Sequence, residues 1–131
     1  MKLGGNEKKI LETLLDMDGG YVLDFSNRTM EGFFQENFEI EIYSKKYDRE
    51  NLSSSKANRL RAIWEEEDEV TVGKIIFALT DYMEVEALTK GKEIPQAKML
   101  LIQKAKEIAA KLIGGPNTVA FQAEAKTVLE K

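Results

Sequence analysis

The sequence predicts a mainly α protein, a compact helical domain of five to six helices. Three observations support this. Apolar residues recur at three- and four-residue spacing through most of the chain, and helix-starting and helix-stopping residues separate these stretches. The composition, 43% hydrophobic and 32% charged, is that of an ordinary globular protein. At 131 residues the chain has the usual size of one domain, so we expect residues 1–131 to form a single helical domain.

The N-terminal half contains two expected helices. Residues 6–17 place several Leu and Ile side chains on one face, with Asn6 as a cap and a glycine pair after the end. The second helix begins after a cap at Ser26 or Asn27, and its apolar stripe is rich in phenylalanine. The next segment, residues 38–43, alternates apolar and acidic residues. This period-two pattern also allows a short strand, as part of a small β-hairpin or wing.

The C-terminal half contains the remaining helices. The third has its buried face over residues 57–64, and the fourth runs from about Glu69 to Met83. The fifth begins at Pro95, a residue that favours the first turn of a helix, and ends at the glycine pair 114–115. A last short helix is expected at about residues 118–130, where apolar residues again share one side.

The chain contains neither Cys nor His, and this excludes much chemistry. A thiol nucleophile, an imidazole general base and the usual zinc ligands are all impossible within it. We therefore expect no enzyme activity, no cofactor and no metal site. The net charge of −4 and the pI near 5.0 argue against broad electrostatic binding to nucleic acid. The apolar runs are too short to span a membrane and the N-terminus lacks a signal-peptide pattern, so we expect a cytoplasmic protein.

Five consecutive acidic residues, Glu65 to Glu69, suggest a metal or catalytic cluster at first sight. A metal site needs carboxylates that converge from several elements, and one run supplies no such convergence. Acids oppose the dipole at the end of a helix and favour it at the start of the next one. We therefore interpret the run structurally, with the third helix ending near Glu66 and Asp68 and Glu69 starting the fourth.

Polar and basic residues at the starts of two helices form the candidate binding surface. Positive charge in the first turns of a helix is unfavourable, yet Lys56, Arg59 and Arg61 lie there, after three serines. Helix amides and nearby bases can bind a phosphate or the carboxylate of a partner. The candidate binding residues are Asn27, Arg28, Lys56, Asn58, Arg59 and Arg61.

Two other interpretations of these bases stay open. Lys56 and Arg59 can point to water while their stems cover apolar surface. Alternatively, Arg59 or Arg61 pairs inside the protein with an acid such as Asp24 or Glu31. At the start of the second helix, Asn27 and Arg28 can likewise cap the helix and bond a nearby carbonyl or carboxylate.

Three stretches, "YVLDFSNRTMEGFFQENFEIEIY", "SSSKANRLRAIWEEEDEVTVGKIIFALTDYME" and "KAKEIAAKLIGGPN", together resemble an N-terminal domain of bacterial abortive-infection proteins of the AbiJ type. The resemblance covers about residues 21–117. The residues that carry it are Phe25, Ser26, Asn27, Arg28, Thr29, Phe33, Phe34, Ser55, Lys56, Asn58, Arg59, Leu60, Arg61, Trp64, Val72, Gly73 and Lys74.

The resemblance implies a non-catalytic sensor, adaptor or interaction module of an anti-phage system, acting through protein contacts. In that family the domain precedes a helical HEPN-like effector, so a HEPN-like protein or another defence component is the expected partner. The HEPN ribonuclease motif needs a His, which this chain lacks. The chain ends about where that effector would begin, so we expect an excised N-terminal domain or a stand-alone relative with a separate effector chain.

Two other functions and a homodimeric state are also compatible with the sequence. The first alternative is a nucleic-acid-binding module of winged-helix type, with residues 56–64 as the reading helix and residues 38–43 in the wing. The second is a phage-encoded inhibitor, such as an anti-CRISPR or a nucleic-acid mimic, because the chain is small and acidic. A homodimer through the long helix from Pro95 to Ile113 is also compatible with its amphipathic pattern.

Overall fold

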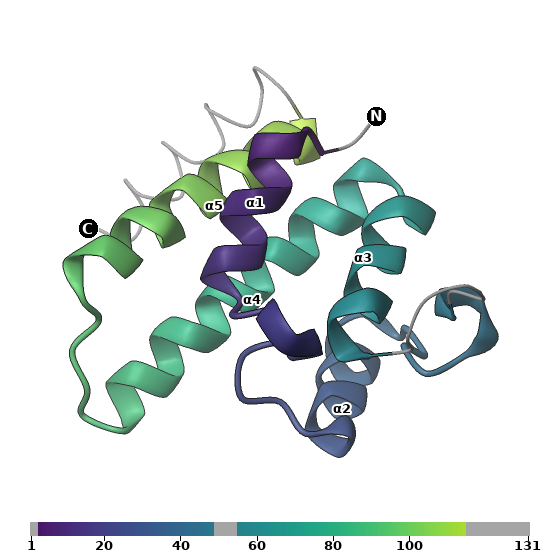
Figure 1. The fold of residues 1–131 in the computed structure, drawn as a ribbon, viewed down its shortest axis with the longest axis horizontal. Helices are drawn as coiled ribbons and strands as arrows, with labels where there is room; N and C mark the ends of the chain where they lie inside the picture. The colour runs from purple at the N-terminus through teal and green to yellow at the C-terminus, as the bar shows by residue number, and fades with distance from the viewer. Residues whose placement is uncertain (1–2, 49–54, 115–131) are drawn as a thin grey trace. The chain divides into compact units, whose positions relative to one another are not determined.

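The structure, a computed structural model, describes residues 3–48 and 55–114 (Figure 1). The described residues form five α-helices and no strand, which confirms the mainly α prediction. The predicted helix at 118–130 lies outside the described residues. The chain divides at Asp68 and Glu69 into a first unit, Met1–Asp68, and a second unit, Glu69–Lys131. The expectation of one domain over residues 1–131 stays a prediction.

The first unit contains three α-helices and two short 3-10 turns. The elements are α1 (Gly5–Leu14), η1 (Asp18–Gly20), α2 (Asn27–Phe38), η2 (Lys45–Tyr47) and α3 (Lys56–Glu66). Both turns lie against α3, which is therefore the central helix of this unit. Its side chains Leu60, Ile63 and Trp64 are buried, as the spacing predicts.

The boundaries of α1 differ from those predicted. Its N-cap is Gly4, whose backbone N–H donates to Glu7 Oε1 at 2.8 Å, so the expected cap at Asn6 is wrong. The helix ends at Leu14, and Asp16 adopts a left-handed conformation with φ of 52°. A left-handed residue cannot continue an α-helix, and this explains why the element stops short of Met17.

The start of α2 matches the prediction of a cap at Ser26. The Thr29 N–H donates to Ser26 Oγ at 3.1 Å, and the Ser26 N–H donates to Thr29 Oγ1 at 2.9 Å. The two bonds satisfy amide donors that the first turn of a helix leaves without a partner. From this start the helix presents its phenylalanines as a cluster, and the ring centroids of Phe33 and Phe34 lie 5.3 Å apart.

The possible strand or wing at residues 38–43 is not found in the structure. Phe38 still belongs to α2, and Glu39 adopts a left-handed conformation with φ of 54°. The Ile40 N–H bonds the carbonyl of Phe34, which closes the helix and turns the chain away from an extended path. Ile40 and Ile42 are both buried, so the alternation correctly marks inward side chains, but they anchor a loop. We call residues 39–48, which include η2, the 39–48 loop.

The second unit contains α4 (Glu69–Thr89) and α5 (Gln96–Gly114), which pack against each other as an antiparallel pair (Figure 1). The helices approach closely at Gly73, where an added Cβ would lie 2.7 Å from Ile113 Cγ1 and 2.8 Å from the Ala109 carbonyl oxygen. Helix α4 is longer than predicted and continues past Met83, whereas α5 begins after Pro95 as expected.

Candidate functional site

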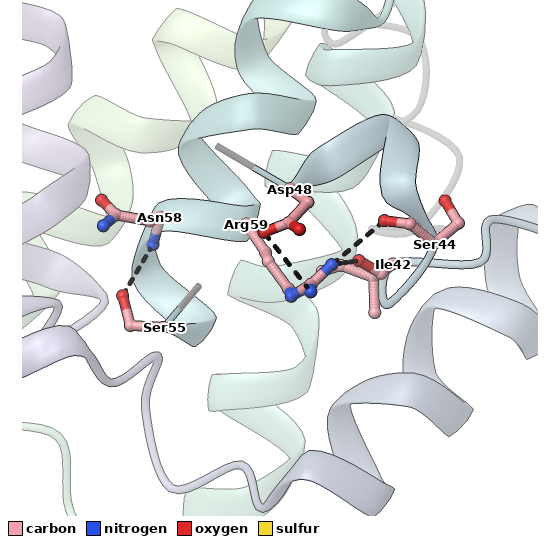
Figure 2. A network of polar contacts seen from close by, with 6 residues as sticks. All are labelled: Ile42, Ser44, Asp48, Ser55, Asn58 and Arg59. Atoms are coloured by element: carbon pink, nitrogen blue, oxygen red, sulfur yellow. Dashed lines mark hydrogen bonds and ion pairs between the residues drawn. The ribbon is translucent and has the colours of Figure 1, made fainter. Parts of the chain in front are cut away.

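Arg59 is the central residue of the predicted binding surface, and its side chain is buried. It comes from α3, and its Nη1 donates to the carbonyl oxygens of Ile42 at 2.9 Å and Ser44 at 3.1 Å. Figure 2 shows the guanidinium directed at these two loop carbonyls, with Asp48 Oδ1 4.0 Å from Nη2. Arg59 thus fastens the 39–48 loop to α3, and its side chain is 11% exposed. The expectation that Arg59 points to water is wrong.

Tyr43 extends this contact to α2. Its ring lies under the Arg59 guanidinium, 5.0 Å from centroid to Cζ, in a cation–π arrangement. Its hydroxyl donates to Asn27 Oδ1 at 2.8 Å. Burial raises the pKa of Tyr43, while the charge of Arg59 opposes part of this rise. Asn27 and Arg59 are therefore brought together through Tyr43, in a structural link between α2, the loop and α3.

A second contact joins the 39–48 loop to the end of α3. The Tyr47 hydroxyl donates to Glu67 Oε2 at 2.6 Å, and Lys46 Nζ lies 2.8 Å from the same oxygen. Burial and the carboxylate raise the pKa of Tyr47 to about 12. Burial also favours a higher pKa for Glu67, but the hydrogen bonds from Lys46 and Tyr47 outweigh it and the net pKa is lowered. We call these three residues the Tyr47 clasp.

Arg61 also pairs inside the first unit. Its Nε lies 2.7 Å from Glu12 Oε2 on α1, and its Nη1 donates to Asn58 Oδ1 at 2.9 Å. The Asn58 N–H in turn donates to the cap Ser55 Oγ at 3.2 Å, also visible in Figure 2. The hypothesis that Arg59 or Arg61 pairs within the protein is confirmed, with Asp48 and Glu12 as acidic partners where the sequence suggested Asp24 or Glu31 as examples.

Among the candidate residues, Asn27 and Arg28 are exposed and Lys56 is half-exposed. Lys56 is half-exposed in the first turn of α3, and its Nζ lies 5.5 Å from the centroid of the Tyr21 ring. Tyr21 is 60% exposed and directly follows Gly20, where an added Cβ would lie 3.0 Å from Ser55 Cβ. The turn and the start of α3 thus hold Tyr21 and Lys56 together, and we call them the Tyr21–Lys56 surface. Tyr21 was not among the predicted residues.

The acidic run is divided between elements as the structural interpretation expects. Helix α3 ends at Glu66, and α4 begins at Glu69. Glu67 is used by the Tyr47 clasp, while Glu65 and Glu66 are exposed. Over residues 3–48 and 55–114, no group of three or more acidic side chains is placed to hold a metal ion.

Comparison with protein-family models, with curated proteins and with solved structures identifies no match to this chain. The resemblance to AbiJ-type N-terminal domains therefore stays a prediction. Within the described part of the chain, no helix has both the length and the apolar character needed to cross a membrane.

Proposed function

We propose that this chain is a non-catalytic sensor, adaptor or interaction module that works through protein contacts in the cytoplasm, in a bacterial anti-phage system. The defence context rests on the resemblance alone. The observation that carries the interaction role is the Tyr21–Lys56 surface, where a large exposed aromatic ring lies beside a cation. Aromatic residues are enriched at the centres of protein interfaces, and a neighbouring cation adds selectivity for an acidic partner.

Four of the other candidate residues make internal contacts, so the proposed binding surface is limited to Tyr21 and Lys56. Arg59 and Arg61 bond the 39–48 loop and α1, and Asn27 and Asn58 accept hydrogen bonds within the first unit. These contacts give the four residues a structural role, although Asn27 is exposed and Arg61 is partly exposed. A partner segment with an acidic side chain beside an apolar one fits what Tyr21 and Lys56 offer.

The test is the double variant Tyr21→Ala/Lys56→Glu, compared with the wild type in cells of the native source during phage infection. We expect the variant to lose a protein partner in affinity capture, and to lose protection against phage. The fold should survive, because Tyr21 is mostly exposed and an acid in the first turn of α3 favours the helix dipole. Circular dichroism of the purified variant checks this.

Lys9→Glu is the matched control, since Lys9 is an exposed lysine of α1 in the same unit. It should retain both the partner and protection. Arg28→Glu, at the exposed start of α2, tests whether the surface extends to the second predicted helix start. Protection and partner binding that are unchanged in the Tyr21→Ala/Lys56→Glu variant would contradict the proposal.

The winged-helix alternative needs a strand pair at residues 38–43 and free bases on α3. In the structure α2 ends at Phe38 and a loop follows from Glu39, and Arg59 and Arg61 are engaged in internal contacts. If the captured material were nucleic acid released by moderate salt, this alternative would replace the proposal. Neighbouring genes of phage origin would instead favour the phage-encoded inhibitor.

A further inference from the structure

Helix α4 carries a line of residues that face away from its buried side. They follow one another at spacings of four, three, four, four and three residues, the pattern of a single helix stripe. The stripe consists of Val70, Lys74, Phe77, Asp81, Val85 and Leu88. Val85 is 47% exposed and Leu88 is 80% exposed, while Phe77 is half-buried. We call this line the α4 stripe. Exposed apolar residues arranged in this way are typical of a helix–helix interface.

The two charges in the stripe have opposite signs and are separated along the helix. Lys74 and Asp81 are both exposed, and neither makes an ion pair with another described residue. They are seven residues apart, roughly 10 Å along the axis, so they do not bond each other within the helix. The N-terminal part of the stripe is thus positive and the C-terminal part negative.

This order makes the stripe complementary to itself. When two copies of α4 run antiparallel with Phe77 near a twofold axis, Lys74 of each copy faces Asp81 of the other. The same register places Val70 against Val85, so apolar residues meet apolar ones. A twofold interface uses the same patch on both subunits, so each favourable pair occurs twice. A partner of arbitrary sequence would not match these positions so closely.

We propose that a second copy of this chain binds to the α4 stripe and forms a twofold homodimer through an antiparallel α4 pair. Helix α5, the predicted dimer helix, is less suited to this role. Its exposed apolar residues, Met99 and Leu100, gather at one end, and the exposed side chains farther along are polar or charged, namely Gln103, Lys104, Glu107 and Lys111. The dimer does not depend on the Tyr21–Lys56 surface, so it is tested with the purified chain alone.

The test measures the mass of the purified 131-residue chain by sedimentation velocity over a wide concentration range. The wild type should approach twice the chain mass as the concentration rises. Lys74→Asp and Asp81→Lys should each raise the dissociation constant of the dimer by about tenfold or more, because each change places like charges opposite each other at two symmetric positions. Val85→Lys should also weaken the dimer, because it removes the apolar contact between Val85 and Val70 of the other copy.

The double exchange Lys74→Asp/Asp81→Lys should restore dimerisation, and its net charge equals the −4 of the wild type. An equal mixture of the two single variants should likewise form a mixed dimer. Lys104→Asp, an exposed change on α5, is the control and should leave the dissociation constant unchanged. Circular dichroism confirms the fold of each variant.

A wild type that stays monomeric at every concentration would overturn the proposal. A dimer that neither single variant weakens would place the interface elsewhere. Failure of the double exchange to restore association would show that Lys74 and Asp81 do not face each other. These results concern the purified chain, so they are independent of phage protection.

Discussion

The contacts inside the first unit differ in kind from the contacts inside the second unit. In the first unit, side chains bridge elements that are distant in sequence, such as Arg59 to the 39–48 loop and Arg61 to Glu12 on α1. In the second unit, two long helices pack closely at Gly73, and the ion pair between Lys106 and Glu84 joins them at 2.9 Å. Beside its apolar core, the first unit thus uses side-chain polar contacts to hold a loop, whereas the second unit is mainly a close packing of two helices.

The difference follows from the need of buried backbone N–H and C=O groups for hydrogen-bond partners. A long helix satisfies most of its own N–H and C=O groups, so the α4–α5 pair needs few side-chain donors. The 39–48 loop has no regular ladder, so its buried carbonyls need donors from elsewhere. Arg59 supplies two such bonds from one side chain. Charged residues in a helix can therefore serve a neighbouring loop and not an external ligand.

The largest expected effect comes from the hydrogen bonds between Arg59 and the 39–48 loop. Arg59→Met keeps the apolar stem but removes the bonds to Ile42 and Ser44, and hydrogen bonds from charged donors contribute strongly when buried. We expect the free energy of unfolding to fall by about 3 kcal/mol in urea denaturation. Arg28→Met, an exposed change, is the control and should stay within ~0.5 kcal/mol. A loss below ~1 kcal/mol for Arg59→Met would show that the loop holds without it.

A smaller effect tests close packing in the second unit. Gly73→Ala places a Cβ against Ile113 and the Ala109 carbonyl, so we expect a loss of about 2 kcal/mol in the free energy of unfolding. Helix propensity alone would raise the free energy of unfolding by about 1 kcal/mol, so the sign of the measured change shows which effect is larger. Gly32→Ala in α2 is the matched control, because its added Cβ meets no atom within 4 Å and should stabilise the protein. A gain at both positions would refute the close packing.

The contribution of the Tyr47 clasp to stability depends on pH. Tyr47→Phe removes the hydrogen bond to Glu67 and should cost about 1.5 kcal/mol of unfolding free energy at neutral pH. Folding raises the pKa of Tyr47 from 10.0 to about 12, so its contribution is complete below pH 10 and is lost as the pH rises towards 12. The wild type and Tyr47→Phe should therefore converge in stability over that interval. A constant difference up to pH 12 would argue against the raised pKa.

The smallest effect concerns the half-exposed pair between Arg61 and Glu12. Because water reaches both side chains, Glu12→Gln should lower the unfolding free energy by only about 0.5 kcal/mol. Moderate salt should reduce the difference, since it screens the ion pair. If Glu12→Gln lowered the unfolding free energy as much as Arg59→Met does, the greater exposure of Arg61 would not explain a smaller contribution to stability.

Much of the helical structure was predictable because it depends on local spacing and caps. Ser26 and Ser55 cap α2 and α3, and both helices end where their patterns stop. Helix α4 extends beyond the predicted end at Met83 to Thr89, because the residues past Met83 remain helical with exposed apolar side chains that do not follow the buried pattern.

The candidate site was harder to predict, because the roles of its residues depend on contacts distant in sequence. Nothing local distinguishes an arginine that faces water from one that reaches carbonyls 15 and 17 residues earlier, as Arg59 does. Tyr21 was missed for a similar reason, since its position beside Lys56 arises only when η1 lies against α3. A bulky aromatic after two glycines was the one local signal available.

The bonds from Arg59 go to backbone carbonyls, and this has an evolutionary consequence. A substitution at Ser44 leaves its carbonyl in place, so we expect this position to tolerate change as long as Arg59 is kept, whereas the Ile42 side chain is itself buried. In relatives of this chain, an invariant arginine in the middle of α3 would thus record inherited architecture. Asn27, Asn58, Arg59 and Arg61 are among the residues that carry the predicted AbiJ-type resemblance, so that prediction rests partly on residues that make internal contacts in this structure.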